Sequence, residues 1–286
     1  MTQTLLSFGH GYSASALSRD LLEDGWRVIG TTRTAEKAAV LMSDGVEPRV
    51  WPGADMGPAL DAADHLLISV APGDGGDPVL AALGDEIAAR AGQFRWVGYL
   101  STTGVYGDHQ GGWVDEAMPL APSTKRGQLR VAAEAAWQSI PGLPLHIFRL
   151  AGIYGPGRGP FAKVRAGTAR RIFKPGQVFS RIHVDDIAQV LRASMSQPDP
   201  GAIYNVCDDD PAPPEAVIEH AAELLGLPIP PVEDFATAEM TPMARSFYAE
   251  SKRVRNDRLK DALGVSLRYP DYKVGLRALL ALETAG

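Results

Sequence analysis

The stretch that decides the fold is Leu5-Leu6-Ser7-Phe8-Gly9-His10-Gly11-Tyr12-Ser13-Ala14. A short apolar strand ends at two glycines separated by one residue, and a helical pattern begins directly after them, in the arrangement G-x-G-x-x-G/A. The first glycine permits a tight turn, the second lets a pyrophosphate approach the backbone, and Ala14 allows the helix to pack closely on the strand. The helix N-terminus offers free N–H groups and a positive dipole to phosphates. The stretch predicts a dinucleotide-binding turn, whose binding residues are Gly9, His10, Gly11, Tyr12 and Ser13; the His10 side chain either contacts a phosphate or only lines the turn.

The rest of the first half repeats the alternation of strand and helix. Apolar strand-sized runs alternate with amphipathic helical runs, which predicts a parallel sheet with right-handed crossovers. Strands are expected at residues 5–8, 27–30, 46–51, 65–70, 96–100 and 145–150, and helices at residues 12–24, 35–43, 78–91 and around 132–139. The fold class is therefore a doubly wound α/β (Rossmann) fold, in which a ligand binds beyond the carboxyl ends of the strands.

The second half is less regular and richer in proline and glycine. Helices are expected at residues 184–196, 214–225 and 273–282, a strand at 202–206, and loops at 155–160 and 227–231. We expect a dinucleotide-binding domain over residues 1–155 and a smaller substrate lobe over residues 156–286. The helix at residues 184–196 is expected to return and pack on the first domain.

The bulk composition limits the classes of function. The 286 residues are 45% hydrophobic and 22% charged, with a formal net charge of −6, which is ordinary for a soluble protein and argues against nucleic acid or an anionic membrane as the main partner. The apolar runs are too short to span a bilayer, and no basic residue precedes the first strand, so neither a membrane span nor a signal peptide is expected. The single Cys207 excludes an internal disulfide and a cysteine-based zinc site. A cytoplasmic protein is the expectation.

The end of the second strand predicts the cofactor. A Rossmann domain that prefers NAD places an acidic residue on the ribose 2′-hydroxyl, whereas an arginine accommodates the 2′-phosphate of NADP. The run Gly30-Thr31-Thr32-Arg33-Thr34 contains no acid. Thr32 and Arg33 are therefore predicted to bind NADP rather than NAD; the alternative is a surface arginine that begins a helix.

A polar segment, Ser101-Thr102-Thr103-Gly104-Val105-Tyr106-Gly107, follows the fifth strand. Three further segments come in order: Arg149-Leu150-Ala151-Gly152-Ile153-Tyr154-Gly155-Pro156-Gly157, Arg181-Ile182-His183-Val184-Asp185-Asp186-Ile187-Ala188 and Tyr204-Asn205-Val206. With this ordered set the chain resembles, over nearly its whole length, the extended or atypical short-chain dehydrogenase/reductase superfamily, which includes sugar-nucleotide epimerases and dehydratases. The resemblance implies that Thr102 is the hydroxyl that hydrogen-bonds the reacting carbonyl or hydroxyl. The alternative is that these hydroxyls only satisfy the end of the strand.

The resemblance also implies further cofactor contacts. Asp55 follows the third strand, where family members place an acid near the adenine amino group, and as an alternative it is a simple loop residue. Val70, Ala71 and Pro72 end the fourth strand and would border the cofactor ribose. Ser101 and Gly152 are the remaining cofactor-binding predictions.

The chain departs from the superfamily where proton transfer is expected. Family enzymes use a tyrosine and, four residues on, a lysine, and alignment on Ala133-Glu134 puts Arg126 and Arg130 in those positions. Arginine cannot shuttle protons. Two arginines at i and i+4 lie on one helix face and repel unless an anion sits between them, so they hold a phosphate or carboxylate, or face solvent. The proton is then expected from Tyr106, a substrate group or water.

Two more departures point to an atypical subgroup. Phe179 stands where sugar-nucleotide enzymes carry a diphosphate-binding arginine, and the glycine turn is shorter than the G-x-x-G-x-x-G form that extended enzymes use. Asp185 and Asp186 are interpreted as a helix cap and a first-turn acid rather than a metal site.

The predicted function is an NADP(H)-binding oxidoreductase or epimerase-like enzyme for a small polar or sugar-type substrate. The alternative is a catalytically silent NADP(H)-binding redox sensor or scaffold. A homodimer is expected by family analogy alone.

Overall fold

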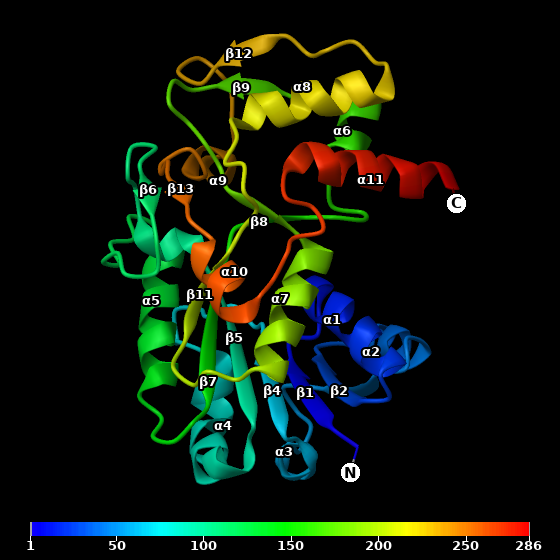
Figure 1. Ribbon diagram of the computed structural model, residues 1–286, viewed down its shortest axis with the longest axis vertical. Helices are drawn as coiled ribbons and strands as arrows, with labels where there is room; N and C mark the ends of the chain where they lie inside the picture. Colours follow the sequence, from blue (N-terminus) through cyan, green and yellow to red (C-terminus); the bar gives the residue numbers. More distant parts are fainter. Residues whose placement is uncertain (1, 286) are drawn as a thin grey trace.

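The computed structural model describes residues 2–285, and its centre is a seven-stranded sheet in the order β11-β7-β5-β4-β1-β2-β3 (Figure 1). The strands are β1 (Thr4–Phe8), β2 (Arg27–Thr32), β3 (Glu47–Val50), β4 (His65–Ile68), β5 (Trp96–Thr102), β7 (Leu145–Leu150) and β11 (Ile203–Val206). Every pair in this sheet is parallel. The strand order reverses between β1 and β4, so the predicted doubly wound parallel fold is confirmed. A crevice beyond the carboxyl ends of β1 and β4 is where such folds bind ligands.

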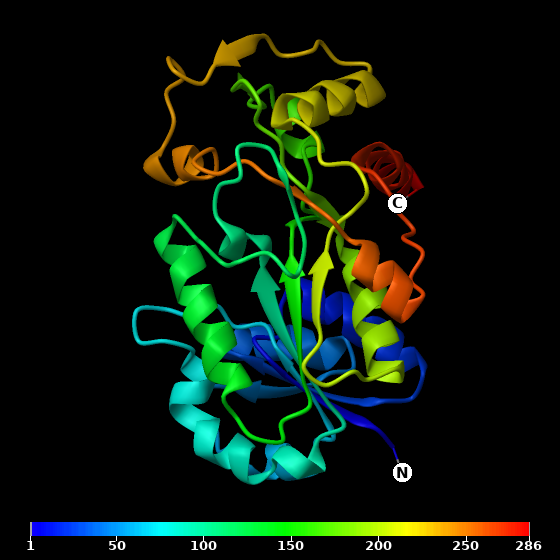
Figure 2. The same ribbon diagram turned by 60° about the vertical axis from the view of Figure 1, so that its left-hand side comes forward.

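Helices cover both faces of the sheet, because its strands bury side chains on both sides. Neighbouring residues of β1 show the alternation: Leu5 belongs to one apolar core and Leu6 to the other. The first core takes side chains from α1 (Tyr12–Glu23), α2 (Ala35–Ser43) and α7 (Val184–Ser196). The second takes them from α3 (Gly57–Ala62), α4 (Pro78–Ala89) and α5 (Lys125–Gln138). Figure 2 shows the sheet between these two layers.

The second half of the chain re-enters the sheet domain through α7 and β11. α7 lies against α1, where Arg192 forms an ion pair with Asp24 at 2.5 Å. The buried indole of Trp96 on β5 donates to the hydroxyl of Ser194 on α7 at 3.0 Å. β11 pairs with β7 and forms one edge of the sheet. The helix expected at residues 184–196 thus packs on the first domain, while the division at residue 155 stays a prediction.

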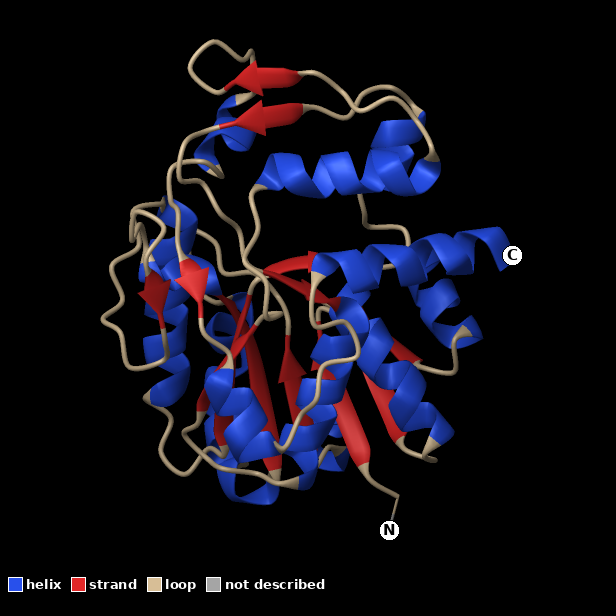
Figure 3. Cartoon of the chain, turned by 45° about the horizontal axis from the view of Figure 1, so that its top comes forward, coloured by secondary structure: helices blue, strands red, loops and turns tan. Residues whose placement is uncertain are grey.

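A smaller lobe with its own apolar core lies beyond the carboxyl ends of the strands (Figures 1 and 3). Its core includes Phe161, Ala221 and Leu276, one from each of the helices α6 (Phe161–Arg165), α8 (Pro214–Leu225) and α11 (Tyr272–Ala285). The remaining short elements are β6 (Trp113–Val114), β8 (Gly152–Tyr154), β9 (Arg171–Phe173), β10 (Arg181–His183), β12 (Val232–Asp234), α9 (Pro242–Ser246), β13 (Arg253–Val254), α10 (Asp257–Leu263) and the 3₁₀ turns η1 (Ala91–Gln93) and η2 (Thr103–Tyr106).

Differences from the sequence-based expectation lie mainly at the ends of elements. α5 begins at Lys125, a full two turns before residue 132, because the Thr124 side chain accepts from the Gly127 N–H at 3.2 Å and caps the helix. β5 extends to Thr102. α3 and the two- and three-residue strands of the second half are too short to leave a periodic pattern. In the part of the chain that the structure describes, no helix is both long and apolar enough to cross a membrane.

Candidate functional site

The glycine turn between β1 and α1 leaves an open helix N-terminus. Gly9 has φ +75°, and a Cβ on it would lie 2.8 Å from Cγ2 of Val70, so both conformation and space require glycine there. The Gly9 N–H donates to the Thr31 hydroxyl at 2.8 Å, which fixes the turn to the end of β2. Gly11 precedes α1 without a side-chain cap, and the first turn of the helix carries no acidic residue. The first N–H groups of α1 are therefore left for an anion.

The His10 side chain points away from this anion site. Its ring packs against Gly30, whose missing Cβ would lie 2.9 Å from the ring, and its Nε2 lies 3.2 Å from the Ser18 hydroxyl. Burial lowers the pKa of His10 from 6.5 to about 4, so the ring is neutral near pH 7. The structure favours the second of the two sequence interpretations: His10 lines the turn, and only its backbone is near the phosphate position.

One cavity of about 750 Å³ joins the glycine turn to the polar end of β5. Its wall combines segments that lie far apart in the sequence: the turn, the end of β5 with η2, the start of α5, the segment after β7, and residues of the small lobe. The predicted site residues that line it are Gly9, Gly11, Tyr12, Ser13, Ser101, Thr102, Arg126, Arg130 and Gly152. A second hollow, of about 510 Å³, lies over α2 and β3 and is lined by alanines, Met42, Ser43 and Val50, without a titratable group.

Thr102 presents a free hydroxyl hydrogen at the end of β5. Its Oγ1 accepts from the Gly104 N–H at 3.1 Å and so caps η2. The hydroxyl donates to no acceptor within the described residues, so its hydrogen is available to a substrate oxygen. The side chain thus satisfies the strand end, as the alternative interpretation expects, and its contact with a reacting group stays a prediction.

A buried polar network fixes the strand end beside Thr102. Ser101 donates to the carboxylate of Glu134, and Glu134 forms a two-bond ion pair with Arg149 at 3.2 and 2.8 Å. Arg149 also donates to the Tyr106 hydroxyl at 3.0 Å, and that hydroxyl donates to Asn205 at 2.7 Å. Ser101 therefore acts inside this network, even though part of it lines the cavity.

The position of Tyr106 differs from the prediction that it supplies the proton. Its side chain is fully buried and does not line the cavity, because η2 turns it inward, where Asn205 and Arg149 hold its phenol. Burial raises the pKa of Tyr106 against the opposing effect of Arg149. A group in this position cannot reach a substrate in the cavity, so it is not the proton source.

Arg126 and Arg130 both face the cavity from the first turns of α5, as expected for positions i and i+4. Arg130 is fixed by hydrogen bonds to the Leu100 carbonyl at 2.6 Å and the Tyr99 hydroxyl at 3.1 Å. Arg126 is exposed, and its guanidinium lies 5.0 Å from the centroid of the Phe247 ring. Neither arginine forms an ion pair with a carboxylate in residues 2–285, so both keep charge for an anionic ligand.

The predicted adenosine-side residues lie at the ends of β2, β3 and β4, outside the cavity. Arg33 is exposed and forms no ion pair or side-chain hydrogen bond within the described residues, whereas Thr32 is buried. The Asp55 carboxylate accepts from the Gly57 N–H at 3.0 Å, a local loop contact. Of the segment Val70, Ala71 and Pro72, only Val70 touches the turn, at Gly9. The cofactor contacts of these residues stay predictions.

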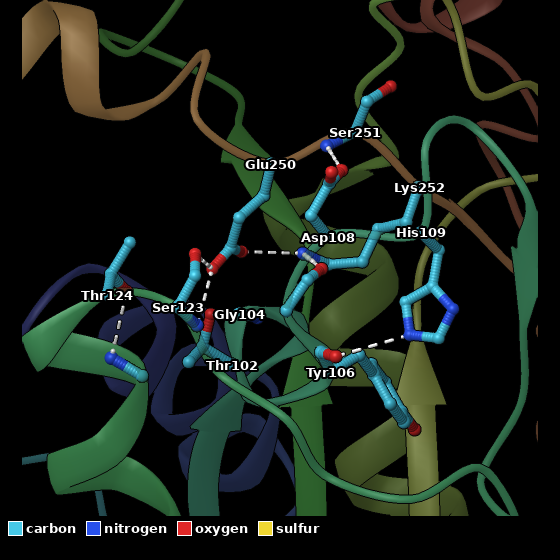
Figure 4. A network of polar contacts seen from close by, with 12 residues as sticks. Thr102, Gly104, Tyr106, Asp108, His109, Ser123, Thr124, Glu250, Ser251 and Lys252 are labelled. Carbon is cyan, nitrogen blue, oxygen red and sulfur yellow. Dashed lines mark hydrogen bonds and ion pairs between the residues drawn. The ribbon is translucent and has the colours of Figure 1, made fainter.

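Three further charged residues that line the cavity are not among the predicted site residues. Arg158 lies with its guanidinium 5.7 Å from the centroid of the Tyr12 ring, beside the open end of α1. Glu250 and Lys252 come from the segment before β13 and form an ion pair at 2.8 Å (Figure 4). Their only signal in the sequence is charge in a stretch without periodicity, more than 40 residues after the motif Tyr204-Asn205-Val206. The structure places no group of three His, Cys, Asp or Glu side chains suited to a metal ion anywhere in residues 2–285.

Comparison with known proteins places the chain among relatives of this fold. A functionally unknown conserved protein from Silicibacter pomeroyi DSS is 66% identical, with a TM-score of 0.94 over 99% of both chains. The chain belongs to the same family as that protein. Protein YeeZ from Escherichia coli strain K12 is 28% identical over 274 residues, which cover 92% of this chain and 95% of YeeZ. No family model matches the chain.

Two further solved structures share the fold. A protein from Methylobacillus flagellatus, named for the NAD-dependent epimerases and dehydratases, is 26% identical with a TM-score of 0.74 over 99% of both chains. The human epimerase family protein SDR39U1, solved with NADPH, is 18% identical with a TM-score of 0.76 over 98% of this chain and 99% of its own. The second of these supports the fold alone.

Proposed function

We propose that this protein binds NADP(H) in the cavity and acts as an oxidoreductase or epimerase-like enzyme on a small polar or sugar-type substrate. One observation carries the proposal: a single cavity contains both the open N-terminus of α1 and the free hydroxyl of Thr102. The names of structural neighbours, which include NAD-dependent enzymes and an NADPH complex, agree with it.

The residues present fit a dinucleotide. A Cβ on Gly9 would collide with Val70, and a Cβ on Gly11 would meet only the Gly9 carbonyl at 3.7 Å, so Gly11 leaves a cradle open to solvent. A pyrophosphate in that cradle would accept from the first N–H groups of α1. Arg158, whose guanidinium lies over the ring of Tyr12 at the start of α1 and forms no ion pair with a carboxylate in the described chain, would neutralise part of its charge.

Arg33 is the proposed NADP-selecting residue. It is exposed at the end of β2 without a partner in residues 2–285, which leaves its guanidinium for a 2′-phosphate. Fluorescence titration with NADPH and NADH tests this role. For Arg33→Gln we expect a loss of roughly 10- to 100-fold in NADPH affinity, the equivalent of one charge-assisted interaction of about 1.5–3 kcal/mol, with NADH affinity unchanged.

Arg95→Gln is the matched control, since Arg95 is also exposed but precedes β5 at the opposite end of the sheet. Equal affinity of the wild type for NADH and NADPH would refute the role of Arg33. Binding of neither dinucleotide would refute the cofactor proposal itself.

In the reaction, bound NADPH would supply a hydride to a substrate carbonyl carbon. Thr102 would donate its hydroxyl hydrogen to the carbonyl oxygen and hold it in place. Arg126 and Arg130 would orient an anionic group of the substrate, because neither is neutralised by a carboxylate. Arg130 is the more rigid of the two, since two hydrogen bonds fix it.

Turnover separates an enzyme from a silent sensor. NADPH oxidation is followed by absorbance with a panel of carbonyl compounds and nucleotide sugars, for the wild type and Thr102→Val, which keeps the shape without the hydroxyl. An enzyme loses roughly 10²-fold in rate on removal of one positioned hydrogen-bond donor. The arginines in place of tyrosine and lysine favour the second candidate, an NADP(H)-binding sensor, for which the wild type would bind NADPH and oxidise none of the panel.

A further inference from the structure

A reaction of this kind needs a proton donor, and few groups lining the cavity can serve. Besides arginines, which stay charged at all working pH values, the titratable cavity residues among those described are Tyr12, Tyr154, Glu250 and Lys252. The Tyr12 phenol donates to the Pro156 carbonyl at 3.0 Å beside the phosphate end of the cavity. Tyr154 is buried with its phenol directed at the Asp271 carbonyl, and burial raises its pKa far above the ordinary value. Both tyrosines are therefore poor acids for the substrate end.

Lys252 is held as a cation with one N–H left over. Its ammonium group donates to the Gly107 carbonyl at 2.7 Å and to the Glu250 carboxylate at 2.8 Å, and its side chain is 11% exposed. A lysine ammonium has three donors, so one remains for a ligand in the cavity. Figure 4 shows the two residues reaching from the small lobe toward the segment that contains Gly104 and Tyr106.

Glu250 is itself fixed from the other side. Ser123, two residues before α5, donates its hydroxyl to the Glu250 carboxylate at 2.6 Å. Burial alone would raise the pKa of Glu250, but hydrogen bonds from Lys252 and Ser123 lower it overall, so the carboxylate is ionised near pH 7. Asp108, whose pKa is also lowered, against burial, by backbone N–H donors and by Lys174 and Lys252, adds a second negative charge.

Thr102 and Lys252 contact opposite ends of the 3₁₀ turn η2. Thr102 caps η2, and Gly107, whose carbonyl holds Lys252, directly follows η2. A four-residue 3₁₀ turn rises only about 8 Å. Thr102 and Lys252 both line the same cavity.

We propose that Lys252 is the proton donor to the substrate oxygen, in place of the tyrosine that this chain lacks. The inference rests on the proposed oxidoreductase function. As a hydride from NADPH adds to the carbonyl carbon, the C=O π electrons move to oxygen and an N–H bond of Lys252 breaks while the new O–H bond forms. The neutral amine then takes a proton from solvent, and in the oxidising direction each step runs in reverse.

The test compares Lys252→Arg and Lys252→Met with the wild type in the NADPH oxidation assay. Arginine keeps the charge and the donors but cannot release a proton. We expect kcat to fall about 10²-fold or more in both variants, with KM within a few-fold of the wild type for Lys252→Arg and unchanged NADPH affinity by fluorescence titration. Lys163→Arg, an exposed lysine on α6, is the control.

Each outcome has a separate meaning. Full kcat in Lys252→Arg overturns the inference and leaves the proposed function intact, because charge and hydrogen bonding alone would then suffice. A wild type that binds NADPH but reduces nothing in the panel overturns the enzymatic function and the proton donor with it. Thermal unfolding of each variant shows that lost activity is not lost folding.

Discussion

Removal of the Glu134 charge is expected to destabilise the whole protein. Glu134 and Arg149 have side chains only 3% exposed and are joined by two hydrogen bonds. Glu134→Gln keeps the shape but leaves a buried guanidinium without a counter-charge, and its amide nitrogen opposes one guanidinium N–H. Breaking one partner of a buried ion pair costs about 3–5 kcal/mol. At roughly 2–4 °C per kcal/mol for a chain of this size, the melting temperature should fall by about 6–20 °C.

Urea unfolding followed by circular dichroism measures the free energy of unfolding for Glu134→Gln, Arg149→Met and the double variant. We expect the double variant to be less destabilised than the sum of the singles by at least about 2 kcal/mol, because neither charge is then left alone. A loss below about 1 kcal/mol for Glu134→Gln, or simple additivity, would refute the account of this pair.

Three other perturbations follow from the glycine turn and its surroundings. Gly9→Ala should lower both the melting temperature and NADPH affinity more than Gly142→Ala, since both have positive φ but only Gly9 is crowded, by Val70; equal effects in both assays would contradict this. Burial lowers the pKa of His10 from 6.5 to about 4. As the pH falls from 6.5 to 4, the unfolded state therefore takes up a proton at His10 before the folded state does. The free energy of unfolding should fall over this range by on the order of 3 kcal/mol. The wild type but not His10→Gln should show this loss in urea titrations across that range, and parallel curves would count against it. Arg158→Met should weaken NADPH and NADH equally, by roughly 10-fold for one lost charge-assisted hydrogen bond, whereas a selective loss of NADPH in the titration would assign Arg158 to the 2′-phosphate instead.

The fold was predictable because its signals are local. The glycines after β1, the apolar strands and the amphipathic helices each leave a pattern within ten or so residues, and the doubly wound sheet follows from their order. The position of Thr102 in the cavity wall was predictable for the same reason, since it is the last residue of the strand β5, whose carboxyl end faces the cavity. Residues 132–138 lie in α5, and the i and i+4 spacing of Arg126 and Arg130 agrees with the same helix; its exact start was not predictable because the cap, Thr124, lies in a stretch without apolar periodicity.

The rest of the site depends on contacts between residues that are far apart in the sequence and leave no local pattern in it. Tyr106 was predicted in the cavity from its position after the strand, but its direction is decided by Asn205, 99 residues away, and by Arg149. Glu250 and Lys252 reach the cavity only because β13 pairs with β6, where Arg253 lies opposite Trp113. A two-residue pairing of this kind has no recognisable pattern in a single sequence.

The return of the chain through α7 and β11 limits how the protein can be divided. A fragment ending near residue 155 would lack β11, so β7, whose sequence is Leu145-His146-Ile147-Phe148-Arg149-Leu150, would become the outer strand of the sheet, paired with β5 on one side only. It would also lose α7, and with it the cover over Leu17 and Leu21. An exposed apolar edge of this kind recruits other chains. We therefore expect a fragment of residues 1–155 to aggregate, and an exchange of the small lobe between homologues to require that residues 184–206 stay with the first half.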